Sequence, residues 1–345
     1  MPKVFIDGQE IVAAEGATVL ETALAADIYI PYLCYHPDLS TFGGCRVCMV
    51  DINGKLVTAC RAVVSEGMVV LTDTPDVSLV RRVTVEMILA NHNPDCQSCG
   101  RNHDCTLQEV SAYVGITEEN LAKLRRSARE IPSDTSNPFF KMDHTRCILC
   151  GICVRTCQEI NGVSAIDFSH RGTGTKVSAL AGKPLAESKC VACGECVERC
   201  PTGALARKNN INPAREVQTV CTYCGCGCGI YLGVRGNEVM RVRGNAASPV
   251  NEGDLCVKGR FGFQFINHPD RLTTPLIKRN GLFEEASWEE ALDLVASKFV
   301  ETKEKYGAEA LGGLASARVT NEDNYLFQKL LRSLGSNSID CCARL

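Results

Sequence analysis

The sequence predicts an α+β protein built from several small domains. Its 345 residues are 45% hydrophobic and 22% charged, which is a globular composition, and the length exceeds that of one typical domain. Of its 22 cysteines, 20 lie in the first 260 residues, so something other than a large apolar core organises that part. After about residue 270 the pattern changes to amphipathic helices, as in an α/β domain.

The N-terminal region predicts a small sheet with one helix. Residues 3–12 and 57–71 alternate as in short strands, and residues 19–25 have helical spacing. Thr74 and Pro75, as cap and first-turn residue, predict the start of a helix that leads to the second cysteine group.

Two later regions complete the expected elements. Residues 117–131 are rich in Glu, Lys and Arg and predict a solvated helix, which is followed by a linker at 131–138. Residues 287–305 and 321–334 predict amphipathic helices, and the Gly-rich stretch 310–316 between them predicts a strand. This last part is expected to be the beginning of an α/β domain.

Composition and charge exclude several classes of function. The N-terminus lacks a basic segment followed by an apolar stretch, and no run approaches the roughly 18 apolar residues needed to cross a bilayer. We therefore expect a cytoplasmic protein with no membrane span. Because a reducing cytoplasm disfavours disulfides, metal or redox roles remain for the cysteines. A net charge of −3 with interspersed signs gives no support for nucleic-acid binding.

The first cysteine group surrounds a tight glycine-rich loop. Four thiolates are what a [2Fe–2S] cluster requires, and glycines let backbone N–H groups approach its negative charge. A structural zinc site also accepts four cysteines and is the alternative. The loop and its sheet-and-helix context favour the cluster. The predicted ligands are Cys34, Cys45, Cys48 and Cys60.

The second group combines one histidine with three cysteines, and we predict a [4Fe–4S] cluster on His92, Cys96, Cys99 and Cys105. His103 is the alternative imidazole ligand, but it is only two residues from Cys105 and would crowd the same face. Because imidazole is neutral, this cluster is expected to have a higher potential than one with four thiolates.

The third group is an internal repeat and gives the strongest signal in the chain. A CxxCxxCxxxC run recurs 43 residues later, and the second copy ends in Cys-Pro, as in bacterial ferredoxins with two clusters. In that arrangement the fourth cysteine of each run binds the other cluster, whereas zinc is a weak alternative. The predicted [4Fe–4S] ligands are Cys147, Cys150, Cys153 and Cys200 for one cluster, and Cys157, Cys190, Cys193 and Cys196 for the other.

The fourth group predicts a further [4Fe–4S] cluster, on Cys221, Cys224, Cys228 and Cys256. The glycines that alternate with these cysteines resemble a dinucleotide loop, but no strand-to-helix context surrounds them. Cys226 is expected to pack as a small apolar residue, and Cys341 and Cys342 are left over. The sequence therefore predicts one [2Fe–2S] and four [4Fe–4S] clusters.

These motifs resemble known families over nearly the whole chain. Residues 1–210 resemble the shared front end of the complex I large iron–sulfur subunit, [FeFe] hydrogenases and NAD-linked formate dehydrogenases. The fourth cysteine group, Cys256 to Arg260 and the run 268–276 resemble the first module of bis-molybdopterin oxidoreductases. Residues 320–325 and 337–345 look like formate dehydrogenase in particular.

The resemblance implies a fold for each segment. It implies a β-grasp [2Fe–2S] ferredoxin, a helical [4Fe–4S] segment with one histidine and three cysteine ligands, a bacterial 2[4Fe–4S] ferredoxin, a molybdopterin oxidoreductase [4Fe–4S] domain and the incomplete start of a molybdopterin-binding α/β domain. The corresponding boundaries are 1–78, 79–118, 138–208, 214–270 and 271–345.

The resemblance also implies an activity, the reversible oxidation of formate to CO2 at molybdenum or tungsten bound by bis-molybdopterin guanine dinucleotide. This chain would carry electrons to a flavin- and NAD-binding iron–sulfur subunit, or to ferredoxin or hydrogenase subunits. Lys258 corresponds to a lysine between cluster and pterin, and its alternative is a solvent-exposed lysine. The alternative functions are a free-standing iron–sulfur carrier and a subunit like those of complex I or [FeFe] hydrogenase.

No catalytic residue is expected within this chain. In formate dehydrogenases the residue directly after the Cys-Ala-Arg segment is the selenocysteine or cysteine that binds the metal, and this sequence stops at Leu345, one position short. Because selenocysteine is encoded by a codon that otherwise means stop, we expect translation of the natural polypeptide to continue beyond Leu345.

Overall fold

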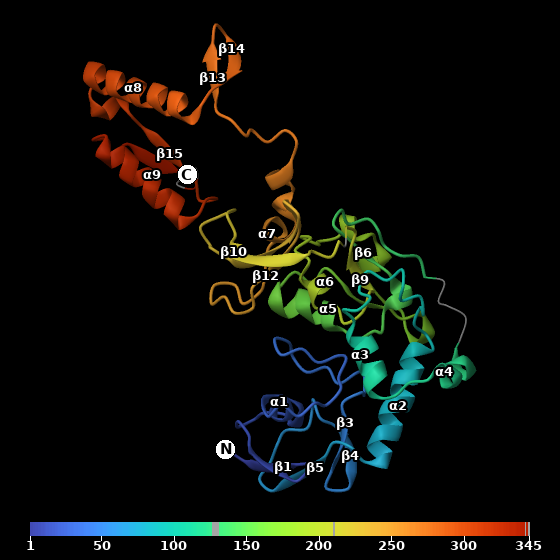
Figure 1. Ribbon diagram of the computed structural model, residues 1–345. Coiled ribbons are helices and arrows are strands. Elements are labelled where there is room, and N and C mark those ends of the chain that lie inside the picture. Colours follow the sequence, from blue (N-terminus) through green and yellow to red (C-terminus); the bar gives the residue numbers. More distant parts are fainter. Residues whose placement is uncertain (126–130, 210, 342, 344–345) are drawn as a thin grey trace. The chain divides into compact units, whose positions relative to one another are not determined.

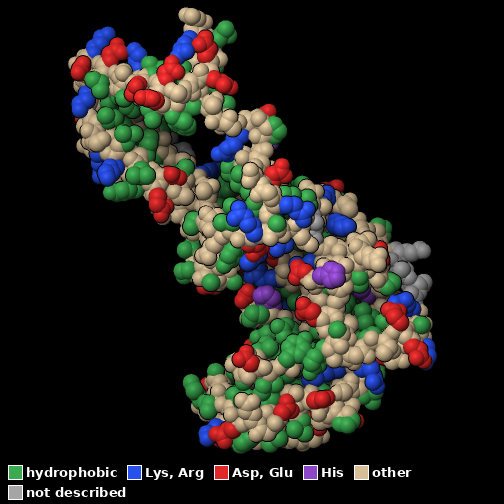
Figure 2. Space-filling view, in the orientation of Figure 1, with side chains coloured by type: hydrophobic (Ala, Val, Ile, Leu, Met, Phe, Trp, Pro, Cys, Tyr) green, Lys and Arg blue, Asp and Glu red, His purple; other side chains and the backbone are tan. Residues whose placement is uncertain are grey.

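The computed structural model describes residues 1–125, 131–209, 211–341 and 343. The chain divides into two compact units, residues 1–210 and 211–345, each of which mixes helices and strands (Figure 1). In the described residues, no helix combines the length and the hydropathy needed to cross a membrane. Acidic and basic side chains are interspersed on the face drawn in Figure 2.

The first unit begins with a five-stranded sheet and one packed helix. The strand order is β2-β1-β5-β3-β4; β1 and β5 run parallel, and the other pairs are antiparallel. Helix α1 buries Leu20 against Val4 and Val70 of the sheet, as the alternating pattern predicted. The bounds are β1 Lys3–Ile6, β2 Gln9–Val12, α1 Val19–Ala25, β3 Met49–Ile52, β4 Lys55–Thr58 and β5 Met68–Leu71.

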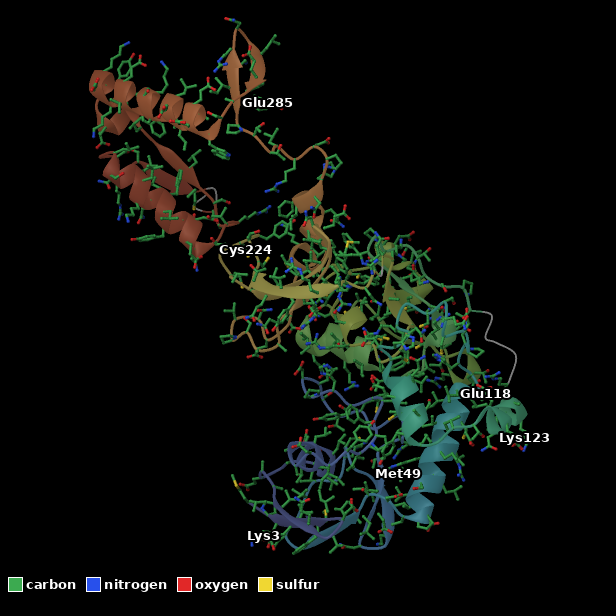
Figure 3. The ribbon with its side chains drawn as sticks, in the orientation of Figure 1. Lys3, Met49, Glu118, Lys123, Cys224 and Glu285 are labelled. Carbon is green, nitrogen blue, oxygen red and sulfur yellow. The ribbon has the colours of Figure 1, made fainter. Side chains whose placement is uncertain are left out.

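Helix α2 (Pro75–Leu89) begins where the sequence predicts, because the Thr74 hydroxyl accepts a hydrogen bond from the Val77 N–H at 3.2 Å. The helix lies beside β3, where buried Arg81 donates to the Met49 carbonyl at 2.6 and 2.9 Å (Figure 3). Two short helices follow, α3 (Thr106–Tyr113) and α4 (Glu118–Leu124). The predicted helix at 117–131 corresponds to α4, and residues 126–130 of that prediction lie outside the described residues.

The remainder of the first unit is a compact domain around the cysteine repeat. Its two cysteine runs each lead into a short helix, α5 and α6, which contact each other. The segment predicted as a linker is held against this domain, because Asp134 pairs with Met142 and accepts a hydrogen bond from the Leu185 N–H at 2.8 Å. The elements are β6 Phe140–Met142, α5 Ile152–Arg155, a π-helical turn Thr156–Ile160, β7 Asp167–Ser169, β8 Lys176–Ser178, α6 Glu195–Glu198 and β9 Leu205–Arg207.

The second unit contains a three-stranded antiparallel sheet followed by the predicted α/β elements. Strands β15 and β16 are parallel and joined through α9, which is the start of an α/β arrangement. The predicted helices and the strand between them are confirmed as α8, β15 and α9. The bounds are β10 Arg215–Val220, β11 Gly229–Arg235, β12 Glu238–Gly244, α7 Val257–Phe261, β13 Leu276–Arg279, β14 Leu282–Glu285, α8 Trp288–Tyr306, β15 Gly313–Ala315, α9 Asn321–Ser333 and β16 Ile339–Cys341.

We predict that Thr18→Ala destabilises α1 by about 1 kcal/mol, which corresponds to roughly fivefold faster amide exchange in that helix. The Thr18 hydroxyl accepts from the Glu21 N–H at 3.2 Å, and the Glu21 carboxylate accepts from the Thr18 N–H at 2.8 Å. Hydrogen exchange of the intact protein measures the effect. Thr18→Ser keeps the hydroxyl and should exchange like the parent; unchanged exchange in Thr18→Ala would contradict the role of this cap.

Candidate metal centres

The four cysteines of the first group meet beside the five-stranded sheet, at what we call the Cys34 site. The antiparallel β3–β4 hairpin lies between Cys48 and Cys60 and so brings both to one end of the hairpin, with the Ala59 N–H donating to the Cys48 carbonyl at 2.8 Å. The other two come from the glycine-rich loop, where the Cys45 N–H lies 3.5 Å from the Cys34 sulfur. Three of the four thiols are 1% exposed.

Hydrogen bonds to sulfur divide the thiols of the Cys34 site into two kinds. The Cys45 thiol, followed by the N–H groups of Cys45 and Gly44, lowers the pKa of Cys34 below its ordinary value. Hydrogen bonding to Cys34 and burial raise the pKa of Cys45, and Cys60 and burial raise that of Cys48 in the same way. Backbone N–H groups directed at sulfur are what an anionic iron–sulfur cluster needs.

The second group lines a cavity that we call the His92 cavity. Its wall contains His92, Cys96, Cys99 and Cys105, and it encloses about 970 Å³ of non-atom space that includes its open side. The Nδ1 atom of His92 is buried without a hydrogen-bond partner. Burial, and then the charge of Arg146, lower the pKa of His92 to about 4, so its imidazole is neutral at pH 7 and keeps a free lone pair for a metal.

His103, the alternative ligand, is placed differently. It is exposed, has a left-handed backbone with φ 64°, and is absent from the lining of the His92 cavity. Its backbone N–H donates to the Gln108 side chain at 3.2 Å. The structure therefore brings His92, and not His103, to the three cysteines.

The repeat lines two further cavities, and the cysteines divide between them in the crossed arrangement. The Cys150 cavity is lined by Cys147, Cys150, Cys153 and Cys200, and its non-atom space, open side included, is about 420 Å³. The Cys193 cavity is lined by Cys157, Cys190, Cys193 and Cys196, with about 430 Å³ measured in the same way. The fourth cysteine of each run thus lies with the first three of the other run.

The backbone repeats along with the sequence. Leu149 and Ala192 each have φ 54°, a conformation that non-glycine residues rarely adopt, and a left-handed glycine follows two residues later in each run. In this conformation the Leu149 N–H lies 3.4 Å from the Cys147 sulfur, and the Ala192 N–H lies 3.4 Å from the Cys190 sulfur. Both runs therefore curl around their first thiol in the same way.

Burial sets the electrostatics of these cavities. It raises the pKa of Cys150, Cys153 and Cys196, and neighbouring thiolates raise it further. Metal binding would consequently displace protons from these thiols. Among the described residues, no group of three or more His, Cys, Asp and Glu side chains is arranged to hold a single metal ion. The donors instead surround spaces, and soft sulfur donors around a cavity fit an iron–sulfur cluster.

The sites of the first unit adjoin one another. Cys34 and Cys150 belong to one buried apolar cluster. The Cys105 thiol donates to the Pro201 carbonyl at 3.6 Å, next to Cys200. Met142 lines both the Cys150 and the Cys193 cavity.

The fourth group lies in the second unit, at what we call the Cys221 site. The β10–β11 loop supplies three cysteines, of which Figure 3 labels Cys224, and the Cys221 N–H donates to the Cys228 carbonyl at 2.8 Å. Cys256 directly precedes α7, and its charge acts on the pKa of Cys221. These four residues are therefore near one another.

Three further residues of the second unit differ in outcome. The expectation that Cys226 packs as an apolar residue is wrong, because the loop turns this side chain toward solvent; its sulfur lies 3.6 Å from that of Cys228. Lys258 is exposed on α7. Cys341 ends β16 half-buried, whereas Cys342 and Leu345 lie outside the described residues.

Sequence reasoning missed the residues that hold these cavities together. Arg146 is buried, and its guanidinium donates to the Asp95 carbonyl at 2.7 Å and to the Ser98 hydroxyl at 3.1 Å. A Cβ atom at Gly203 would collide with the Cys99 sulfur, so the absence of a side chain there lets the two segments approach. The available signal was their position, directly before the first run and directly after the second.

Five protein families match successive parts of the chain. They are the 2Fe-2S iron-sulfur cluster binding domain (3–75), the NADH-ubiquinone oxidoreductase-G iron-sulfur binding region (81–120), the NADH-quinone oxidoreductase subunit 3 ferredoxin-like domain (137–206), the molybdopterin oxidoreductase Fe4S4 domain (214–268) and molybdopterin oxidoreductase (271–345).

The chain belongs to the iron–sulfur molybdopterin oxidoreductases. This confirms the predicted fold class, a [2Fe–2S] domain followed by [4Fe–4S] domains and a molybdopterin oxidoreductase domain.

Several members of this oxidoreductase family are similar over nearly the whole chain. "Putative formate dehydrogenase YrhE" of Bacillus subtilis is 35% identical over 98% of this chain and 39% of its own length. The NADPH-Fe(3+) oxidoreductase subunit alpha of Geobacter sulfurreducens and an NADH-quinone oxidoreductase subunit of Rhizobium meliloti are each 39% identical over 100% of this chain and 40% of their own length. The chain thus spans about two fifths of the length of these relatives.

A solved structure also resembles this oxidoreductase. One chain of the NAD+-reducing [NiFe]-hydrogenase in the H2-reduced state is 34% identical, with a TM-score of 0.57. The match covers 60% of this chain and 87% of the hydrogenase chain.

We predict that His92→Ala abolishes one [4Fe–4S] signal, whereas His103→Ala leaves it intact, because only His92 faces the cavity with a free nitrogen. Iron and acid-labile sulfide analysis of the anaerobically purified protein, with electron paramagnetic resonance (EPR) of the reduced form, gives the measurement. Loss of the signal in His103→Ala alone would reverse the assignment.

We predict that Gly203→Ala damages the same cluster without removing any ligand, because the added Cβ would displace the Cys99 sulfur. The matched control is Gly174→Ala, where the Cβ would meet only the His170 Cβ at 3.9 Å. The change should appear as partial loss or altered shape of the His92-cluster signal. An unaltered spectrum in Gly203→Ala would contradict the close approach.

Proposed function

We propose that this chain is the electron-transfer front of a formate dehydrogenase, which passes electrons between a molybdenum- or tungsten-bis-molybdopterin site and a redox partner. The observation that carries the electron-transfer role is the separation of twelve predicted donors into three cavities of four each. The formate role is supported by relatives named formate dehydrogenase, at 31% to 35% identity, and by the motifs at 320–325 and 337–345.

The proposed ligand sets are those of the sequence analysis. A [2Fe–2S] cluster would bind at the Cys34 site, and [4Fe–4S] clusters would bind in the His92, Cys150 and Cys193 cavities and at the Cys221 site. Shared walls support transfer within the first unit. Cys34 lies in one apolar cluster with Cys150, and Met142 separates the Cys150 and Cys193 cavities. Electrons would enter from the Cys221 site, cross the two repeat cavities and leave at the Cys34 site.

The His92 cavity is proposed as a side station. It adjoins the Cys150 cavity through the Cys105–Pro201 contact, so a cluster there would exchange electrons with that cavity without lying between it and the Cys34 site. A neutral imidazole ligand would raise its potential, so it would hold an electron under reducing conditions.

The metal–pterin group would supply the two-electron oxidation of formate to CO2. The residues of this chain would hold and tune the clusters that carry the electrons singly. Lys258, two residues after Cys256, is proposed to contribute a positive charge between the Cys221 cluster and the pterin; its exposure leaves the ammonium free to do so. The proposed partners are a flavin- and NAD-binding iron–sulfur subunit, or ferredoxin or hydrogenase subunits.

A second candidate is an NADH- or NADPH-linked electron-transfer subunit without formate chemistry. It is favoured by the 39% identity to the Geobacter and Rhizobium relatives, which exceeds the identity to the formate dehydrogenases. A carrier with iron but no molybdenum or tungsten is the simplest form of this alternative.

Anaerobic reduction of the protein isolated from its native source separates the candidates. We expect iron and sulfide for five clusters, molybdenum or tungsten, and bleaching of cluster absorbance by formate in the absence of nicotinamide. Bleaching by NADH or NADPH but not formate would support the second candidate and overturn the first. Colourless protein without acid-labile sulfide would overturn both.

A further inference from the structure

Arg155 joins the two parts of the first unit that are proposed to carry clusters. It lies in α5 and its continuation, between Cys153 and Cys157 of the first repeat run. Its guanidinium nevertheless reaches the first domain, where one nitrogen donates to the Cys34 carbonyl at 2.6 Å and the other to the Ser40 carbonyl. A residue of the repeat thus grips the backbone at a predicted ligand of the Cys34 site.

The loop that Arg155 holds, residues 34–44, is fixed at several points. Its Phe42 ring lies 5.5 Å from the Arg155 guanidinium carbon and stacks on Phe168 at 6.1 Å. The carboxylate of Glu159, four residues after Arg155, accepts from the Ser40 N–H at 2.7 Å and from its hydroxyl at 2.5 Å. One helical turn of the repeat therefore presents a cation and an anion to the same loop.

The positive charge of Arg155 is buried, and the exposed carboxylate of Glu159 is near enough to interact with it without forming an ion pair. The residue is 7% exposed, and its Nε has no hydrogen-bond partner. No carboxylate forms an ion pair with it in the part of the chain that the structure describes. A buried cation with only carbonyl partners is costly, so a nearby anionic group would offset much of that cost.

Anionic groups are expected on both sides of this guanidinium. Cys34 lies in one buried apolar cluster with Cys150. Along the sequence, Cys150 precedes Cys153 by three residues and Arg155 by five. On the proposed function, on which this inference rests, these thiolates belong to a [2Fe–2S] and a [4Fe–4S] cluster. Each cluster becomes more negative when it is reduced, and charges interact strongly where water is excluded.

We infer that Arg155 is a positioning residue that holds the Cys34 loop against the cysteine repeat and whose fixed charge raises the reduction potential of the [2Fe–2S] cluster. The same side chain fixes the position of the Cys34 loop relative to the repeat, and it favours the reduced state of the [2Fe–2S] cluster. The loop itself, residues 34–44, contains no lysine or arginine.

The test is an EPR-monitored dithionite titration of the intact protein with redox mediators. Arg155→Gln should shift the midpoint of the [2Fe–2S] signal to lower potential. Arg155→Lys keeps the charge and should restore most of that shift. Glu159→Gln also loosens the loop but removes a negative charge, so it should shift the midpoint slightly upward. Arg171→Gln removes a solvent-screened charge from an exposed arginine and serves as the control; it should leave the [2Fe–2S] midpoint unchanged.

The titration distinguishes failure of this inference from failure of the proposed function. Absence of a [2Fe–2S] signal in the parent protein would overturn cluster binding itself. A parent signal with the same midpoint in Arg155→Gln would overturn the inference. Shifts of the same sign in Arg155→Gln and Glu159→Gln would overturn the charge and leave only a structural contact. If Arg155→Gln does not fold, the other two variants still test the role of the charge. A parent-like midpoint in Arg155→Lys together with an upward shift in Glu159→Gln would support that role. Equal downward shifts in both variants would overturn it.

Discussion

The first 210 residues depend on keeping many thiols close together without joining them. No disulfide joins the described cysteines, and burial raises the pKa of Cys150, Cys153 and Cys196 in the repeat. Sulfur atoms in such positions neither ionise readily alone nor form a conventional apolar core. An iron–sulfur cluster would stabilise such an arrangement, because its iron atoms replace the thiol protons and link sulfurs from distant segments. Much of the folding free energy of these domains is then metal-binding free energy.

The crossed arrangement of the repeat follows from that constraint. Each run supplies two thiols from a tight loop, a third from its short helix and a fourth from beyond that helix. The loop conformation at Leu149 and Ala192 is the same. Because the helices α5 and α6 pack together, the fourth thiol of each run reaches the partner cavity. Neither half can complete a cavity without the other, so the two sites fold as one.

Buried arginines connect the loops that surround these sites. Arg146 ties the His92 loop to the repeat, and Arg155 ties the Cys34 loop to it. Arg155 donates to two backbone carbonyls. Arg146 donates to the Asp95 carbonyl and the Ser98 hydroxyl and also forms an ion pair with Asp143 at 3.2 Å. Both sets of contacts fix loop positions. Fixed positive charges among cysteines favour bound anionic clusters, and they favour the reduced state.

The sequence by itself determined the elements and the groups of donors. Alternation predicted a small sheet with one helix, although not strand β3. Thr74 and Pro75 predicted the start of α2, and the 43-residue repeat predicted the crossed cavities, because these signals are local or depend on spacing alone. The sequence favoured His92 over His103, and the structure places His92 in the cavity wall. Only the tertiary structure decided that Cys226 is exposed, that Gly203 admits Cys99, and that Arg155 spans two domains. Those outcomes depend on which surfaces meet after folding, and contacts between residues more than a hundred positions apart leave no periodic trace along the chain.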